Sequence, residues 1–179
     1  GDAKVKNPAA ALSIEAAELL HDKLQTNTGL TVNLVLTCKS MERTKGYNVI
    51  GDITGSEKPD EIVLVGGHLD SWDLGTGAQD DGAGSVQSMQ VMSLFKQTGY
   101  TPKRTHRVVL FMNEEFGLDG AKAYAEYSKK ENINHVIALE SDGGSGTPRG
   151  FSFDTNMETV EAIREFKSLL SPYGLHDYA

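Results

Sequence analysis

Residues 61–84 read EIVLVGGHLDSWDLGTGAQDDGAG. The stretch opens with a short, continuous apolar run (61–67), which is typical of a β-strand buried on both faces. The part from residue 66 onward contains one histidine, four aspartates and six glycines. Carboxylates that gather beside a histidine repel one another unless a cation lies among them or each points into water. The rest of the chain has to decide between these two arrangements.

Apolar strands and amphipathic helices alternate along the chain. We expect strands at 31–37, 47–53, 61–67, 105–113 and 135–141, the last three of them buried. Helices are expected from the N-cap Ser13 to Gly29, at about 82–97, at 119–130, and after a capping box of Thr155 and Glu158. The second helix should pack through Val86, Met89, Met92 and Phe95, and the last one through Met157, Val160, Ile163, Phe166 and Leu169. This alternation predicts an α/β fold with three α/β/α layers and a mostly parallel or mixed central sheet.

The composition excludes several classes of protein. The chain has 179 residues, 39% of them hydrophobic, and a formal net charge of -8. An acidic chain argues against nucleic acid or an anionic membrane as a general partner. No apolar run approaches the roughly 18 residues of a membrane span, and no stretch resembles a signal peptide. The single cysteine, Cys38, excludes an internal disulfide.

Acidic residues and one histidine follow the carboxyl ends of the three central strands. In open α/β sheets this edge is where ligands bind, so we expect these side chains to converge there. They are His68 and Asp70 after 61–67, Asp80 and Asp81 at the start of the next helix, Glu114 and Glu115 after 105–113, and Asp142 after 135–141.

These residue types suit a divalent cation such as zinc, which imidazole and carboxylate groups both bind. No thiolate accompanies them, and the spacing differs from a calcium loop. A metal ion lowers the pKa of a bound water, and a nearby carboxylate can take its proton. The adjacent Glu114 and Glu115 could divide these roles, one as base and one as ligand.

Each residue also has a simpler interpretation. Asp80 and Asp81 could only cap a helix, and the glutamates could be a solvated strand end. Asp142 could be a turn residue, and His68 an ordinary hydrogen-bonded histidine. All of these coincidences would have to fall at one sheet edge, so the joint pattern favours a metal site.

Four ordered motifs carry a family resemblance. They are G-H-L-D-S-W-D (67–73), G-A-x-D-D-G-x-G (77–84), N-E-E-F-G-L (113–118) and E-S-D-G (140–143). Over about residues 8–155 the chain resembles the co-catalytic dizinc exopeptidases of metallopeptidase family 28, and within them the carboxypeptidase Q-like branch. The resemblance implies two Zn²⁺ ions in the full-length enzyme, a peptide or dipeptide substrate, and hydrolysis near a chain terminus by a metal-bridged water. It also implies a secreted, periplasmic or extracellular location and a possible homodimer.

The resemblance also implies a role for each site residue. His68 and Asp142 would bind one zinc, Asp80 would bridge both zincs, and Glu115 would bind the second. Glu114 would be the general base. Asp70 would orient the His68 ring, and the Asp80–Asp81 peptide bond would be cis.

The chain departs from the family pattern in one respect. The second zinc needs a further histidine beyond the position of Asp142, and His176 comes too early to match it. We therefore expect an internal fragment with one complete zinc site (His68, Asp80 and Asp142) and with little or no activity of its own. Residues 1–28 would be the tail of a protease-associated-type inserted domain or a linking helix, and residues 29–179 the N-terminal part of the catalytic domain. A non-catalytic, receptor-like relative and a mono-zinc, glutaminyl-cyclase-like enzyme of the same fold remain as alternatives.

Overall fold

The computed structural model describes residues 8–39 and 41–178. They belong to two compact units, residues 1–44 and 45–179. In the first unit, helix α1 (Ile14–Thr26) begins after Ser13, whose hydroxyl accepts a hydrogen bond from the Ala16 amide, as predicted. The predicted strand at 31–37 is wrong, because these residues have no regular secondary structure. A strand needs a partner, and the described residues of this unit contain no second strand to pair with. The assignment of residues 1–28 to an inserted domain or linking helix stays a prediction.

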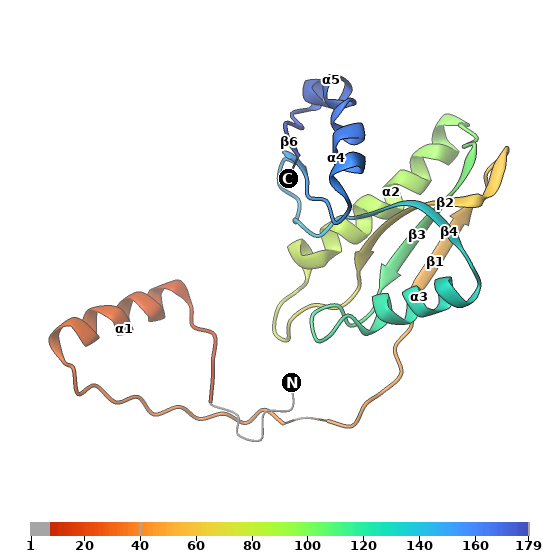
Figure 1. Ribbon diagram of the computed structural model, residues 1–179. Coiled ribbons are helices and arrows are strands. Elements are labelled where there is room, and N and C mark those ends of the chain that lie inside the picture. Colours follow the sequence, from red (N-terminus) through yellow and green to blue (C-terminus); the bar gives the residue numbers. More distant parts are fainter. Residues whose placement is uncertain (1–7, 40, 179) are drawn as a thin grey trace. The chain divides into compact units, whose positions relative to one another are not determined.

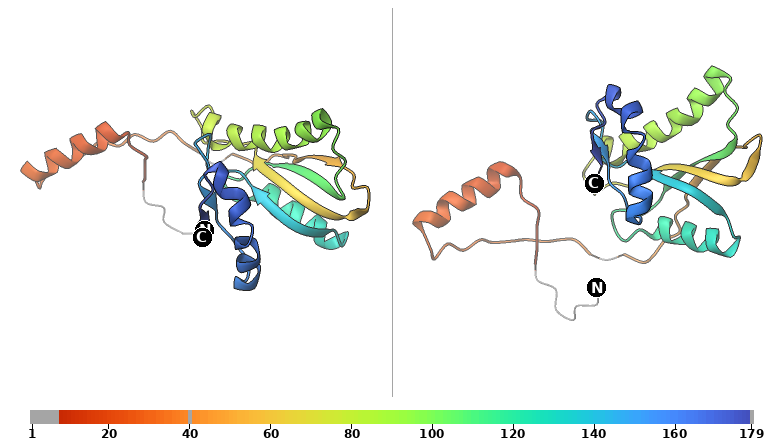
Figure 2. Two further views of the ribbon diagram at one scale, coloured as in Figure 1. Left: turned by 90° about the horizontal axis from the view of Figure 1, so that it is seen from above. Right: turned by 45° about the horizontal axis from the view of Figure 1, so that its top comes forward.

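The second unit is built around a four-stranded mixed sheet. Its strands are β1 (Val49–Ile53), β2 (Lys58–His68), β3 (Arg104–Phe111) and β4 (Asn134–Glu140). Their order is β1-β3-β2-β4, with β2 parallel to both of its neighbours and β1 antiparallel to β3. Helices α2 (Ala83–Thr98) and α3 (Asp119–Lys130) cover opposite faces of the sheet (Figures 1 and 2). The predicted three-layer α/β/α fold is confirmed.

A smaller group of elements follows β4. The short strands β5 (Gly150–Phe151) and β6 (Asp177–Tyr178) pair in parallel, and α4 (Met157–Arg164), α5 (Lys167–Leu170) and the 3₁₀-helix η2 (Ser171–Tyr173) lie between them in sequence. Helix α4 begins one residue later than predicted, since the side chain of Asn156, and not that of Thr155, accepts the capping hydrogen bond from the Thr159 amide. The predicted apolar stripe is also wrong in part. Val160 is buried, but Met157, Phe166 and Leu169 are exposed. The helix breaks after Arg164, so one continuous face does not form.

The core lies between the two central strands and α3. It contains Ile62 and Leu64 of β2, Val109 and Phe111 of β3, and Tyr124 of α3. The prediction that 135–141 is a buried strand is wrong: most of β4 is exposed, including Val136, Ile137 and Leu139. Strand β4 is an edge strand of the described sheet and pairs with β2 alone. Fewer elements therefore pack against its side chains, which stay accessible to solvent. No helix among the described residues is long and apolar enough to cross a membrane.

Helix α2 contacts β2 through small residues. Of the predicted apolar stripe, Phe95 contacts the sheet, with its ring centroid 4.5 Å from that of His106 in β3. Gly84, Ser85 and Ser88 are buried, whereas Val86 and Met89 are exposed. The Ser85 hydroxyl donates to the His68 carbonyl and the Ser88 hydroxyl to the Gly66 carbonyl, each at 2.8 Å. Small side chains let the helix approach the end of β2 closely, and their hydroxyls donate hydrogen bonds to backbone carbonyls of that strand.

A buried carboxylate joins β2 to α2. Asp81 is 1% exposed, and its two oxygens accept hydrogen bonds from the His68 amide (2.8 Å) and the Gly84 amide (3.0 Å). It lies in the turn η1 (Ala78–Gly82), directly before α2, where the backbone of Asp80 and Asp81 is not helical. A Cβ atom at Gly67 would meet the Asp81 carboxylate, and one at Gly84 would overlap both that carboxylate and the Ser141 carbonyl. Glycine is therefore required at both positions by close packing.

We expect Gly84→Ala to lower the free energy of unfolding by about 1–3 kcal/mol or more, because the new methyl group has no space. Urea unfolding of the chain followed by circular dichroism measures this. Gly146→Ala is the matched control, since a Cβ at Gly146 meets no atom within 4 Å. Equal stabilities of the two variants would refute the packing constraint.

Asp81→Asn should lower the free energy of unfolding by about 1–3 kcal/mol, because the amide NH₂ would face one of two buried N–H donors that need an acceptor. Thermal and urea unfolding measure the loss. Asp154→Asn, at an exposed position, is the control that should leave stability unchanged. A stability loss no larger than that of the control would show that the carboxylate does not join the two elements as described.

Candidate metal centre

His68 occupies the last position of β2, and its ring is fully enclosed, with 1% of the residue exposed. Its Nδ1 lies 3.0 Å from the backbone carbonyl oxygen of Asp70. A carbonyl can only accept a hydrogen bond, so Nδ1 carries a proton in this contact. In the neutral ring Nε2 is then an unprotonated nitrogen, which is the state that binds a metal.

Two carboxylates face this nitrogen. Oδ1 of Asp80 lies 3.0 Å from His68 Nε2 and Oδ1 of Asp142 lies 3.2 Å from it, while Oε2 of Glu114 lies at 4.0 Å. A nitrogen lone pair and carboxylate oxygens repel at such distances unless a proton or a cation lies between them. A proton or a cation between His68 Nε2 and these carboxylate oxygens therefore stabilises the arrangement.

Asp70 connects the histidine to the loop after β3. Its carboxylate accepts hydrogen bonds from the Glu114 amide (2.9 Å) and the Glu115 amide (3.2 Å). The His68 ring is held by the Asp70 backbone carbonyl, since the carboxylate oxygen is farther away, at 3.8 Å. Asp70 thus fixes the ring through its main chain and the two glutamates through its side chain.

The residues fit a zinc ion. Two groups of possible ligands share His68, one with Asp80 and Glu115 and one with Asp81 and Asp142, and the ligand atoms of each group lie within 4.8 Å of one another. Bonds of about 2.0–2.1 Å place neighbouring ligand atoms of a tetrahedral zinc about 3.3 Å apart, close to the His68 distances. Oε1 of Glu115 is buried without a hydrogen-bond partner in the described part of the chain, as expected of a ligand atom.

Asp81 is better explained as a structural residue than as a ligand. Both of its oxygens already accept backbone hydrogen bonds, and its neighbour Asp80 has a side chain that is 61% exposed and directed at His68. The peptide bond between the two is cis, as the family resemblance implied. All six predicted site residues lie at this edge of the sheet. The predicted zinc site of His68, Asp80 and Asp142 is not one of the two groups, however, because Asp80 groups with Glu115 and Asp142 groups with Asp81. His176 belongs to neither group of possible ligands among the described residues.

The electrostatics of the cluster follow from burial and crowded negative charge. Burial opposes protonation of His68, but the hydrogen bonds to Asp142 and to the Asp70 carbonyl, with the nearby carboxylates, raise its pKa overall. Burial, supported by the charges of Asp142, Glu115 and Asp70, raises the pKa of Glu114 although His68 opposes it. A carboxylate with a raised pKa is a stronger base, so Glu114 is suited to accept a proton.

A further connection was not predicted from sequence. The side-chain oxygen of Gln79, in η1, accepts hydrogen bonds from the Ser145 amide (2.7 Å) and hydroxyl (3.1 Å). It joins the segment that carries Asp80 to the loop that follows Asp142. The two residues are 66 positions apart, and neither has a local pattern that would indicate the pairing.

Known proteins similar to this chain are peptidases. Residues 48–178 match peptidase family M28. Carboxypeptidase Q of Rattus norvegicus is 38% identical over 97% of this chain, and that of Homo sapiens is 37% identical over the same share. A vacuolar membrane protease of Aspergillus niger is 30% identical over 88% of the chain. The chain spans 37% of the length of the two carboxypeptidases and 17% of the fungal protease.

A solved structure is also similar. The crystal structure of a peptidase M28 precursor from Shewanella amazonensis superposes with a TM-score of 0.66 at 41% identity, and the match covers 72% of this chain and 29% of that one. The sequence match covers β1 to β6, which includes every residue of the His68 cluster. The chain belongs to peptidase family M28.

Proposed function

We propose that the whole protein is a zinc-dependent exopeptidase. Its metal centre would be the His68 cluster, which consists of His68, Asp80, Glu114, Glu115 and Asp142. The observation that carries this proposal is the position of one histidine nitrogen, His68 Nε2, close to carboxylate oxygens from two other segments, Asp80 at 3.0 Å and Asp142 at 3.2 Å. Membership of a peptidase family supports peptide hydrolysis. The names of the carboxypeptidase Q relatives support cleavage near a chain terminus.

In this proposal His68, Asp80 and Asp142 hold one zinc, and Asp80 and Glu115 contribute to a second. Zinc, when bound, polarises a peptide carbonyl and lowers the pKa of water. Residues of the chain itself hold the ligands in position. The Asp70 carbonyl keeps the proton of His68 on Nδ1, which leaves Nε2 free to bind. The Asp70 carboxylate fixes the backbone of Glu114 and Glu115 at the same edge.

Glu114 is proposed as the general base. Its side chain is 28% exposed, so it can reach both the cluster and a substrate at the open side. Its Oε2 lies 4.0 Å from His68 Nε2, which is too far for a direct hydrogen bond to that nitrogen. The carboxylate is still close enough to accept a proton from a water bound at the cluster. It would accept a proton from water as the carbonyl is attacked and return it to the leaving amine. Secretion and homodimer formation stay predictions.

The chain should take up zinc through His68. We expect about one zinc per chain at neutral pH, measured by elemental analysis after dialysis, and loss of most of it in His68→Ala. His21→Ala, on the exposed α1, is the control that should retain zinc. Because the pKa of His68 is raised and zinc binds only the unprotonated ring, uptake should fall as the pH is lowered through neutrality. Absence of uptake with excess zinc, or equal uptake by His68→Ala, would contradict the assignment.

Glu114→Gln in the whole protein should lower kcat by about 10²–10⁴-fold, because the amide cannot accept the proton. Zinc content should be retained. Glu126→Gln, at an exposed position of α3, is the matched control and should keep normal activity. Peptide hydrolysis and metal content are measured on the same samples. A Gln variant with near-normal kcat would remove Glu114 from the base role, whereas loss of zinc would identify it as a ligand.

A further inference from the structure

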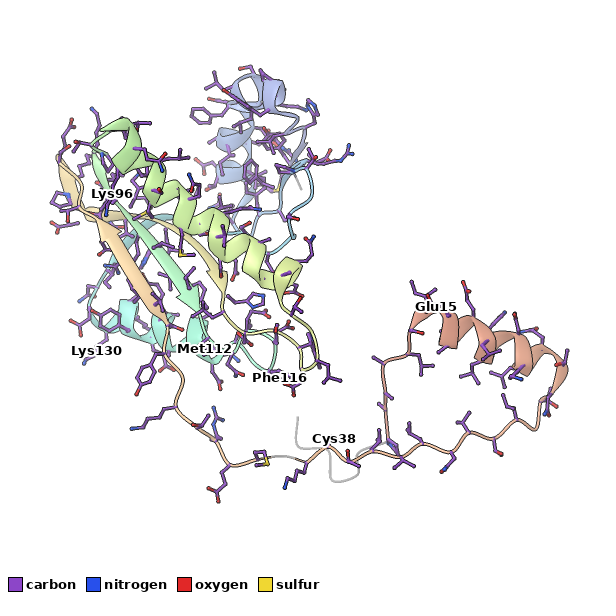
Figure 3. All side chains as sticks on the ribbon, turned by 180° about the vertical axis from the view of Figure 1, so that it is seen from behind. Glu15, Cys38, Lys96, Met112, Phe116 and Lys130 are labelled. Atoms are coloured by element: carbon purple, nitrogen blue, oxygen red, sulfur yellow. The ribbon has the colours of Figure 1, made fainter. Side chains whose placement is uncertain are left out.

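The two loops that carry the acidic cluster also carry exposed apolar side chains. Residues 69–77 follow β2 and residues 112–118 follow β3, at the same edge of the sheet (Figure 3, where Met112 and Phe116 are labelled). Five large apolar residues on these loops are exposed: Leu69, Trp72, Leu74, Phe116 and Leu118. Exposed apolar side chains that gather beside a polar site are typical of a binding surface.

Two of these side chains form a defined pair. The rings of Trp72 and Phe116 have centroids 5.0 Å apart and are tilted by 56°. This is a favourable aromatic arrangement, and it joins the loop after β2 to the loop after β3. Trp72 and Phe116 remain 59% and 58% exposed. The pair therefore keeps a large apolar surface free to contact another molecule. We call these two side chains the aromatic wall.

The aromatic wall is held beside the candidate metal centre. Trp72 is two residues from Asp70, and Phe116 directly follows Glu115. The Asp70 carboxylate accepts hydrogen bonds from the amides of Glu114 and Glu115, which fixes the loop that carries Trp72 against the loop that carries Phe116. Consecutive Cα atoms are about 3.8 Å apart, so both rings start within about 8 Å of Asp70 or Glu115. A peptide with its scissile bond at the cluster would place a neighbouring side chain within reach of the wall.

The surrounding charges restrict which side chain fits. Asp73 is exposed and directly follows Trp72, and Asp70 and Glu114 each lie two residues before one member of the aromatic wall. These carboxylates repel an acidic side chain, whereas an apolar one gains about 25 cal/mol for each Å² that it buries. An aromatic ring also gains stacking energy against Trp72 or Phe116.

We propose that Trp72 and Phe116 form a specificity subsite that binds an apolar, preferably aromatic, side chain of the peptide substrate next to the scissile bond. This inference rests on the proposed peptidase function. In this proposal the substrate side chain contacts the aromatic wall. If a second copy of the chain or another segment of the whole protein covered the wall instead, Trp72→Ala and Phe116→Ala would not change the selectivity between dipeptides.

The test compares dipeptides in the whole zinc-loaded protein. Values of kcat/KM are measured for Ala-Ala, Phe-Ala and Ala-Phe with the wild type, Trp72→Ala and Phe116→Ala. We expect both variants to lower kcat/KM for one phenylalanine dipeptide by about tenfold or more, and to change that for Ala-Ala by less than about twofold. Trp72→Phe should restore most of the preference, because it keeps an aromatic face. Tyr127→Ala, which removes an exposed aromatic residue of α3, should change none of the values.

Each other outcome has a distinct meaning. If the wild type cleaves none of the three peptides, the proposed function itself fails. If the wild type is active but the variants lower all three values equally, or none, the subsite inference is overturned. A change in subunit assembly in Trp72→Ala, seen by light scattering without a change in selectivity, would assign the wall to a second copy instead and also overturn it. Circular dichroism of each variant confirms that it is folded.

Discussion

The geometry of the candidate site depends on one buried carboxylate. Asp81 accepts hydrogen bonds from the backbone amides of His68 and Gly84, so the end of β2 and the start of α2 are fixed to each other through a single side chain. A buried carboxylate without such donors would be strongly destabilised. The same bond fixes the backbone of His68, and the Asp70 carbonyl holds its ring with Nε2 toward Asp80 and Asp142. Glycine at 67 and 84 follows from this interaction, because a larger residue would occupy the space of the carboxylate.

The sequence was sufficient to predict the sheet edge and the residues at it. Strand ends are readable because the apolar runs at 61–67 and 105–113 stop at polar residues, and parallel strands bring these ends together. The residues after them, His68, Asp70 and Glu114 among them, therefore had to converge whatever the details of packing. The order β1-β3-β2-β4 was not predictable in this way, since pairing depends on contacts between distant segments.

Helix packing was predicted only in part by the sequence patterns. The spacing of Val86 and Met89 indicated an inward apolar stripe, yet α2 turns Ser85 and Ser88 to the sheet. Hydroxyl bonds to the His68 and Gly66 carbonyls and the close approach at Gly84 hold this first part of α2 against β2, while Phe95 contacts β3 farther along. Periodicity measures hydrophobicity alone, and it cannot register a hydrogen bond to a carbonyl in another element. The strand predicted at 31–37 failed for a related reason, because a pattern does not provide a pairing partner.

The carboxylates of Asp80 and Asp142 are accessible to solvent, so the fold does not depend on a bound metal. The His68 side chain is fully enclosed, but the side chains of Asp80 and Asp142 are 61% and 49% exposed. Water on the open side screens their repulsion, so the crowded charges destabilise the fold far less than a buried cluster would. The backbone of the site is fixed independently, by Asp81 and by the Asp70 carboxylate. In a zinc finger the metal supplies the folding energy, whereas here the core of β2, β3 and α3 supplies it. A zinc ion at this edge would therefore enter a site that hydrogen bonds have already arranged, and its binding would not have to supply the free energy of folding.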